Sequence, residues 1–507
     1  MNEQFQTRQF RSKRNRLWYI RMRRFNMRKF LTDRVVSQRS QHLRESLHCD
    51  HDSVNKIFKA GRPVSLQARV SRQSWVRYVG RTGRNSLPSR DASSINLDLK
   101  PVLLLLIVCF LMPVHAWATE TPLSGADRAA IVNGNNAFAI ELYGQLRKQN
   151  GNLFFSPESI STALGMAYAG ARGETAVEMA KTLHFTLPPE QLQLAMGALL
   201  TDLNSVHVGY QLRVADSLWA QQGSTFLPDF LKQIEINYGA GLNQVDFKGA
   251  TEAARLTINQ WIDRKTDNKI TDLLQPGVLT PQTRLALTNA IYFKGDWQTQ
   301  FDKAQTKNED FHSSQAQAIQ APLMHREGSF RYFNGGTFQA LEIPYKGAEL
   351  SMIVFLPNEV EGLSVLEASM TASNTQQWLH QLRAVPKVIV TLPKFKMTQQ
   401  FGLKDTLGAM GMPQAFERGV ADFSGMTGKR DFIISAVIHK AYIDVNEEGT
   451  EAAAATAVVM SRAMAMAPNR VQPPVFRADH PFVFLIRADR SGAILFMGRV
   501  TDPAKEN

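Results

Sequence analysis

The chain has 507 residues, 44% of them hydrophobic, and a formal net charge of +13 at pH 7. This length exceeds one ordinary domain but allows a single large domain of mixed sheet and helix. The charge is concentrated at one end: residues 1–100 carry 23 Lys and Arg against 7 Asp and Glu, whereas the remainder carries 35 against 38. The basic balance therefore gives no reason to expect a nucleic-acid partner for the rest of the chain.

The chain has two cysteines, Cys49 and Cys109, and both precede residue 119. Residues 119–507 therefore cannot contain a disulfide scaffold, a cysteine zinc site or a cysteine nucleophile. The sequence motifs of serine hydrolases, zinc proteases, P-loop proteins and dinucleotide-binding folds are also absent. These observations argue against the common enzyme classes.

The first 118 residues form two segments of different composition. Residues 1–100 are rich in Arg, Gln and Ser, with interleaved aromatic residues such as Trp18 and Phe25, which suits an arm that binds nucleic acid or anionic membrane. We favour the alternative of a disordered extension or sequence upstream of the true start. Residues 101–118 combine an apolar run with small residues at Ala116 and Ala118, the layout of a secretory signal. We therefore expect a mature domain at 119–507 that is secreted, or periplasmic in a bacterium.

Two helices are expected next. Ala126–Lys148 is amphipathic, with apolar residues at i, i+4 spacing. Ser156 and Pro157 are typical of a helix N-cap and a first helical position, so a second helix begins there.

Strands are expected further along the chain. Nearly uncharged apolar runs at Leu285–Gly295, Leu350–Pro357 and Val388–Phe395 are typical of buried strands. Near the end, Phe482–Ile486 and Ala493–Val500 flank a polar turn and predict a buried hairpin.

The segment after Ile433–Val445 is unusual. Ile433–Val445 alternates apolar and polar residues as a long strand does, with His439 on its apolar face. It is followed by E-E-G-T-E-A-A-A-A-T-A-V-V-M-S-R at residues 447–462, which has small residues on one face if extended. A run of alanine alone favours a helix. The flanking strands favour the extended interpretation.

Several motifs occur in the order found in one family. They are N-L-F-F-S-P-E-S-I-S from Asn152, L-A-L-T-N-A-I-Y-F-K-G from Leu285, the strand segments from Leu350 and Val388, A-D-F-S-G-M from Ala421, and the run from Glu447. In these motifs the chain resembles the serpins, the serine-protease-inhibitor superfamily. The resemblance spans residues 131–503.

The resemblance implies an α+β fold of three β-sheets and eight or nine helices, with an exposed reactive-centre loop. It implies no enzymatic activity, no metal and no cofactor, and a monomer without a nucleic-acid partner. It places a hydrogen-bonded set beneath the middle of the central sheet and a packing residue near the point where the loop enters it: Ser156, Ser159, Asn289, His439 and Trp297. A lone His at position 439 is also typical of a satisfied core histidine.

The resemblance also implies that the loop is cleaved by a serine protease and then inserts into the central sheet as a strand, a known serpin mechanism. The residues of the hinge would be Glu447, Gly449, Thr450, Glu451, Ala452, Ala453, Ala454 and Ala455. Counting from Glu447 gives Ala463–Met464 as the reactive bond. The alternatives are Arg462–Ala463 and a bond nearer Arg470.

Small residues at the reactive bond indicate an elastase- or subtilisin-like target, and Arg462 would suit a trypsin-like one. Two other functions stay open. A non-inhibitory serpin would act as a carrier or chaperone, although such proteins tend to have bulky, charged or proline-containing hinges. A hydrolase would need its own Ser and His, for which no motif is present.

Overall fold

The computed structural model describes residues 124–205, 207–239, 242–450 and 472–506, all within one compact unit. The predicted basic extension (1–100) and the signal-like segment (101–118) lie outside the described residues. The division of the chain at residues 118 and 119 therefore stays a prediction.

The helix predicted at Ala126–Lys148 is confirmed as α5, which begins after a capping box formed by Ser124 and Asp127. The N-cap at Ser156 is also confirmed, because its hydroxyl accepts a hydrogen bond from the Ser159 amide. The described residues contain ten α-helices, the last of them a single turn. They are α5 (Gly125–Leu146), α6 (Pro157–Gly170), α7 (Gly173–Thr182), α8 (Pro189–Leu203), α9 (Pro228–Tyr238), α10 (Thr251–Lys265), α11 (Leu363–Ser369), α12 (Ala372–Gln381), α13 (Lys404–Met410) and α14 (Ser424–Thr427).

The strands agree with most of the apolar runs in the sequence. They are β1 (Leu153–Phe155), β2 (Tyr210–Gln221), β3 (Leu242–Val245), β4 (Leu285–Asp296), β5 (Lys307–Ser314), β6 (Gln317–Asn334), β7 (Phe338–Pro344), β8 (Leu350–Pro357), β9 (Arg383–Pro393), β10 (Phe395–Gly402), β11 (Ile434–Val445), β12 (Gly449–Thr450), β13 (Val475–Arg477), β14 (Phe482–Ala488) and β15 (Ile494–Val500). The predicted terminal hairpin is confirmed as β14 and β15, which pair antiparallel.

The prediction of a single strand at Val388–Phe395 is wrong at its C-terminal end. β9 ends at Pro393 and β10 begins at Phe395, and the two strands belong to different sheets. Lys394 lies between them, and its amide donates to the Pro322 carbonyl. Apolar periodicity does not show such a change of sheet, because both strands are buried on one side.

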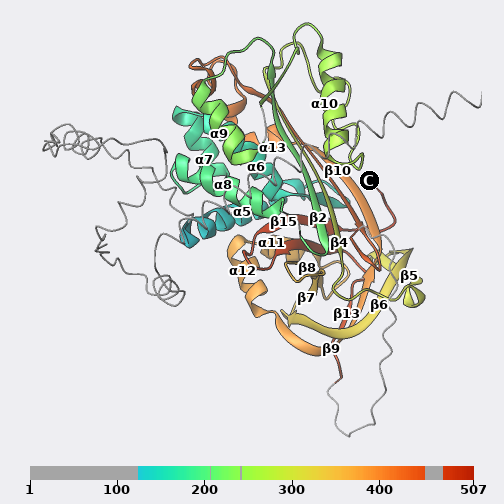
Figure 1. Cartoon of the computed structure of the whole chain (residues 1–507). Helices are drawn as coiled ribbons and strands as arrows, with labels where there is room; N and C mark the ends of the chain where they lie inside the picture. Colours follow the sequence, from blue (N-terminus) through green and yellow to red (C-terminus); the bar gives the residue numbers. More distant parts are fainter. Residues whose placement is uncertain (1–123, 206, 240–241, 451–471, 507) are drawn as a thin grey trace, which may run out of the picture. The chain divides into compact units, whose positions relative to one another are not determined.

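The central sheet has six strands in the order β10-β11-β12-β4-β2-β3, with β11 also paired directly to β4. One face packs on α6 through residues such as Leu287 and Val437. The other face packs on α10, through Ile258 and Ile262 on the helix and Ala286 on β4. Figure 1 shows α10 on one side of these strands and α6 with its neighbouring helices on the other. The central sheet is therefore buried on both faces.

The second sheet has nine strands, in the order β1-β15-β14-β8-β7-β6-β9-β13, with β5 paired to β6. The long strand β6 pairs with β5 and β9 and, at its end, with β7. The mixed fold of sheets and helices is as expected. Hydrogen bonding, however, joins two of the three expected sheets into one through β6.

A search of the described helices for one long and apolar enough to cross a membrane finds none.

Phe154 on β1 tests the packing of the core beneath β15. Its ring is fully buried and stacks on Phe484 and Phe496, with centroid distances of 5.9 and 5.3 Å. We expect Phe154→Ala to lower the free energy of unfolding by about 3–5 kcal/mol, because it leaves a cavity. The measurement is the midpoint of urea unfolding. Val365→Ala, at a position 64% exposed, is the control and should change stability by less than about 0.5 kcal/mol.

Candidate functional site

The site is built around the line where β4 and β11 meet, here called the β4–β11 seam. The two strands pair in parallel from Leu285 and Ile434 to Tyr292 and Tyr442. Beyond that point β12 lies between them, antiparallel to both. Gly449 is opposite Asp296 of β4, and Thr450 is opposite both Gly295 of β4 and Val445 of β11. The chain therefore enters the undescribed segment 451–471 as a strand that already occupies the top of the seam.

A tight turn delivers the chain into this position. The Asn446 amide donates to the Gly449 carbonyl at 2.8 Å, and the Glu448 amide donates to the Asn446 side chain at 3.0 Å. At Gly449 a Cβ atom would overlap the Gly295 carbonyl and lie 2.7 Å from the Asp296 Cα. Only glycine permits this close approach of two backbones.

Trp297 holds the turn from the β4 side. Its amide donates to the Glu448 carbonyl and its indole Nε1 donates to the Asn446 carbonyl, each at 2.9 Å. The buried indole stacks on Tyr345 at 4.6 Å, and the Tyr345 hydroxyl lies 2.8 Å from the Thr450 Oγ1. Trp297 therefore lies beside the turn that leads into segment 451–471, and its role at the entry point of a loop stays a prediction.

Glu447 fixes the turn electrostatically. Its carboxylate is 2.9 Å from the Lys394 Nζ and accepts a hydrogen bond from the Thr306 hydroxyl at 2.8 Å. Burial opposes ionisation, but the Lys394 and Thr306 hydrogen bonds hold the pKa of Glu447 below its ordinary value. The neighbouring Glu448 pairs with Lys303. Ion pairs thus connect the hinge to Lys394, between β9 and β10, and to Lys303 in the segment after β4.

Lower in the seam, three side chains lie in one row across the sheet. The register places Asp216 of β2 opposite Asn289 of β4, and Asn289 opposite His439 of β11. The Asn289 side chain donates to the Asp216 carboxyl and accepts from the His439 Nδ1. The Asn289–His439 bond therefore crosses the seam, and the β4 and β11 strands cannot separate without breaking it.

The first turn of α6 completes this polar cluster. The Ser156 amide donates to the His439 Nε2 at 3.1 Å, and the Ser156 hydroxyl donates to the Leu495 carbonyl at 2.7 Å. The Ser159 hydroxyl accepts from Asn289 and donates to Asp216 at 3.3 Å. The structure brings together Ser156, Ser159, Asn289 and His439, and the role that the family resemblance gives them in admitting a strand stays a prediction.

His439 is neutral in this arrangement. Its Nε2 accepts from a backbone amide, so the ring proton resides on Nδ1, facing the Asn289 oxygen. Complete burial lowers the pKa of His439 to about 3. Both serine hydroxyls of the cluster are fully buried as well, so no substrate can reach them. This geometry argues against the hydrolase hypothesis.

Two buried carboxyl groups of the cluster were missed by the sequence reasoning. Asp216 lies in β2, which also contains Gln211 and Arg213, and Glu158 follows the proline at the start of α6. Burial, and then the nearby Glu158 carboxyl, raise the pKa of Asp216 well above its ordinary value. Each acid looks like a solvent-facing residue on sequence alone, so the sequence offered no clear signal for either.

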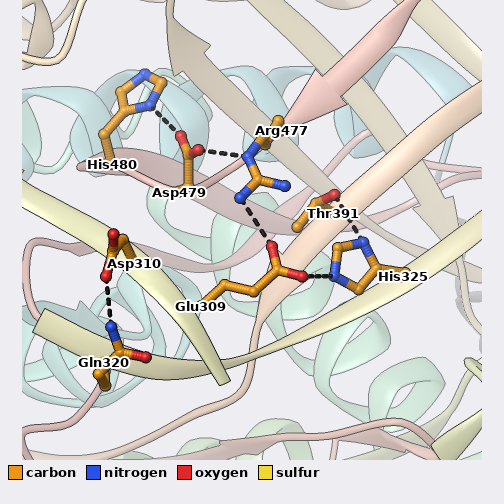
Figure 2. Close-up of polar contacts among 8 residues, drawn as sticks. All are labelled: Glu309, Asp310, Gln320, His325, Thr391, Arg477, Asp479 and His480. Atoms are coloured by element: carbon orange, nitrogen blue, oxygen red, sulfur yellow. Dashed lines mark hydrogen bonds and ion pairs between the residues drawn. The ribbon is translucent and has the colours of Figure 1, made fainter. Parts of the chain in front are cut away.

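The chain returns from the undescribed segment through β13, which pairs in parallel with β9. Figure 2 shows the ionic network that holds this return. The Arg477 guanidinium pairs with Asp479 at 2.6 Å and with Glu309 of β5 at 2.8 Å. Each of these acids also contacts a histidine at 2.9 Å: Glu309 contacts His325, and Asp479 contacts His480. The two ends of the segment are therefore attached to different sheets.

The rest of the predicted loop lies outside the described residues. This applies to Glu451, Ala452, Ala453, Ala454, Ala455, Arg462, Ala463 and Met464, whose assignment stays a prediction. Within the part of the chain that the structure describes, no group of three His, Cys, Asp or Glu side chains could hold a metal ion.

Comparison with known proteins identifies relatives over the same region. The family model described as serpin (serine protease inhibitor) matches residues 133–503. Human leukocyte elastase inhibitor is 40% identical over 381 residues, covering 73% of this chain and 99% of that protein. An uncharacterized serpin-like protein of Thermococcus kodakarensis is 40% identical over 374 residues, covering 74% and 86%.

Solved structures also align with most of this chain. Serpin48 of the insect Tenebrio molitor aligns with a TM-score of 0.66 and 35% identity, covering 73% of this chain and 98% of that one. Human thyroxine-binding globulin in complex with its hormone gives 0.68 and 28%, covering 75% and 100%.

The Lys394–Glu447 pair allows a test of the hinge. We expect Lys394→Met to lower the free energy of unfolding by about 1–3 kcal/mol at pH 7, because it leaves a buried carboxylate without its cation. The depressed pKa of Glu447 means that the pair stabilises the fold above the ordinary carboxyl pKa of 4.5, and that this stabilisation is lost as the pH falls through the lower folded-state value. The cost of the substitution should therefore disappear in acid.

Urea unfolding at pH 7 and in acid measures this effect. Lys387→Met is the matched control, since its partner Glu327 is half exposed and the pair should contribute less than about 1 kcal/mol. Equal costs for the two substitutions would contradict the role given to Lys394.

Proposed function

Because this chain belongs to the serpin family, we propose that it inhibits serine proteases as a suicide substrate, through cleavage of its loop and insertion of the loop into the central sheet. The observation that supports the proposal most directly is the position of β12. Gly449 and Thr450 already lie between β4 and β11, and the chain continues from there into 451–471. Insertion would extend a strand that has begun.

The sequence beyond β12 suits such an extension. Thr450 is fully buried. Side chains alternate along a strand, so Ala452, Ala454 and Thr456 would follow it on the same face. All three are small, and none carries a charge. Burial of this face and new backbone hydrogen bonds on both sides would drive the insertion.

The covalent step would use the protease's own chemistry. Its catalytic serine attacks the carbonyl of the reactive residue, the peptide bond breaks, and the new amino terminus at the next residue leaves while an ester joins loop and protease. Insertion then carries the acylated end along the seam. Hydrolysis of the ester would be blocked if this displacement distorts the active site of the protease before water attacks.

The residues at the reactive bond indicate the class of target protease. We propose Ala463–Met464, which suits an elastase- or subtilisin-like protease, and the name of the human relative, leukocyte elastase inhibitor, supports this choice. Arg462–Ala463 with a trypsin-like protease is the alternative. The residues concerned lie in segment 451–471.

A carrier function is the second candidate, since one of the aligned structures is a globulin solved with bound thyroxine. In a carrier the loop need not insert. The small residues of the hinge favour inhibition over this alternative.

The deciding experiment mixes the full-length chain separately with pancreatic elastase, subtilisin and trypsin. A complex that survives SDS is expected with one of them, and the first residue of the released C-terminal fragment identifies the bond: Met464, Ala463 or Val471. If cleavage gives no complex but raises heat stability, the loop inserts and the target is a different protease. Cleavage without a complex and without added stability would contradict inhibition and favour the carrier.

The face that follows Thr450 provides a test by substitution. Thr450 itself is already buried before cleavage, so the test uses the next residues on its face: we expect Ala454→Arg to leave cleavage intact but to reduce the SDS-stable complex by at least about tenfold, because insertion would bury the arginine at a cost of several kcal/mol. Val475→Arg is the control, since Val475 is half exposed on β13 and does not enter the central sheet. Equal losses in both variants would show that charge in the loop region, and not insertion, is responsible.

We also propose that the protein is exported, on the basis of the signal-like segment 101–118. Mass spectrometry of the mature protein tests this, and peptides from residues 1–90 would contradict it.

A further inference from the structure

Two acids lie buried where α6 meets the central sheet. Glu158 is 2% exposed and Asp216 is 8% exposed. The Glu158 carboxyl accepts one side-chain hydrogen bond, from the Thr162 hydroxyl one turn along α6, at 3.0 Å. The Asp216 carboxyl is bonded by Ser159 and Asn289. Within the described residues, neither acid forms an ion pair.

Buried carboxylates without a cation are costly, because water no longer solvates the charge. The charged or titratable groups facing this pair are few. Lys265 of α10 lines the same cavity of about 200 Å³ as Asp216, but its Nζ lies over the Trp261 ring, 5.7 Å from the centroid. His439 reaches Asp216 only through Asn289. Burial, and then the nearby Glu158 carboxyl, raise the pKa of Asp216, so the protonation of Asp216 depends on that of Glu158.

The acids are linked to the seam by direct hydrogen bonds. Asp216 contacts Asn289, which in turn bonds His439 across the seam. Glu158 lies in the same helical turn as Ser156 and Ser159, which bond His439, Asn289 and Asp216. Separation of β4 from β11 must therefore break the Asn289–His439 bond, which connects Asp216 and Ser159 to β11.

We propose that opening of the β4–β11 seam admits water to Glu158 and Asp216, and that this acid pair makes the opening depend on pH: slow when both carboxyls are protonated and faster when they ionise. The opening is a property of the sheet itself. Only its consequence for protease inhibition rests on the function proposed above.

The sign of the pH dependence follows from the linkage between proton binding and opening of the seam. Burial raises the pKa of Glu158 to about 7, against an ordinary value of 4.5. A group with a raised folded-state pKa stabilises the closed form below its ordinary pKa, and this stabilisation is lost progressively between about pH 4.5 and pH 7. The closed seam is thus most stable in mild acid. His439 does not contribute in this range, since its pKa of about 3 keeps it neutral throughout.

The first test is the rate at which a synthetic peptide of residues 450–461 inserts into the intact protein, without any protease, from pH 5 to pH 8. We expect the rate to rise at least about tenfold between pH 5 and pH 7.5, because the closed-form pKa of Glu158, about 7, lies more than one unit above its ordinary value of 4.5. Incorporation is followed by native gel and by the rise in thermal stability.

Two variants remove the charge but keep hydrogen-bond acceptors in place. Glu158→Gln should remove most of the pH dependence of the insertion rate. Asp216→Asn should move its midpoint and reduce its amplitude. Glu174→Gln, at an exposed position on α7, is the control and should keep the profile of the natural chain. A natural profile in both Glu158→Gln and Asp216→Asn would overturn the proposal.

A second measurement separates this proposal from the proposed function. Hydrogen exchange of the amides at 438–440 in the peptide-free protein reports opening directly, and comparison with Glu158→Gln at each pH cancels the intrinsic exchange rate. If the peptide never inserts, loop insertion fails as a mechanism. The pH-dependent difference in exchange between the two proteins would still support the acid pair, and its absence would refute it.

Discussion

The pairing of β4 with β11 is the interaction on which the rest of the structure depends. β4 is buried along most of its length and β11 at least at alternate residues, with α6 on one face of the sheet and α10 on the other, so water has little access to their backbone hydrogen bonds while the sheet is closed. At the top, however, β12 already separates them. Up to Tyr292 and Tyr442 the two strands pair with each other. Beyond that point each pairs with β12 instead, so the fold contains both the closed sheet and the start of an inserted strand.

Sequence periodicity was sufficient for some of the individual elements, and the family resemblance for part of the site. The strands β4, β8 and β11 and the helix α5 follow from apolar patterns, and the family motifs pointed to His439 and Asn289. Asp216 and Glu158 could not be found in this way, because a polar residue in an apolar run can face solvent or a buried partner. Only the register between β2 and β4, which are far apart in sequence, shows that Asp216 faces Asn289.

The buried cluster also shows how burial reverses ordinary expectations about titration. A histidine is the usual residue for a response near neutral pH. Here burial lowers the pKa of the histidine, whose tautomer is set by a backbone amide, and raises the pKa of the two carboxyl groups. The cause is the same in both cases, since burial between α6 and the sheet disfavours the charged form of each group.

The return of the chain through β13 has a consequence for the fate of a cleaved molecule. After β13 the chain continues into β14 and β15, whose apolar side chains are largely buried in the nine-stranded sheet. Arg499 on β15 also donates to backbone carbonyls at the end of α5, including Gly151 at 2.8 Å. Cleavage within 451–471 would therefore produce two chains that stay associated without a disulfide, and the short C-terminal fragment would dissociate only when the whole domain is denatured.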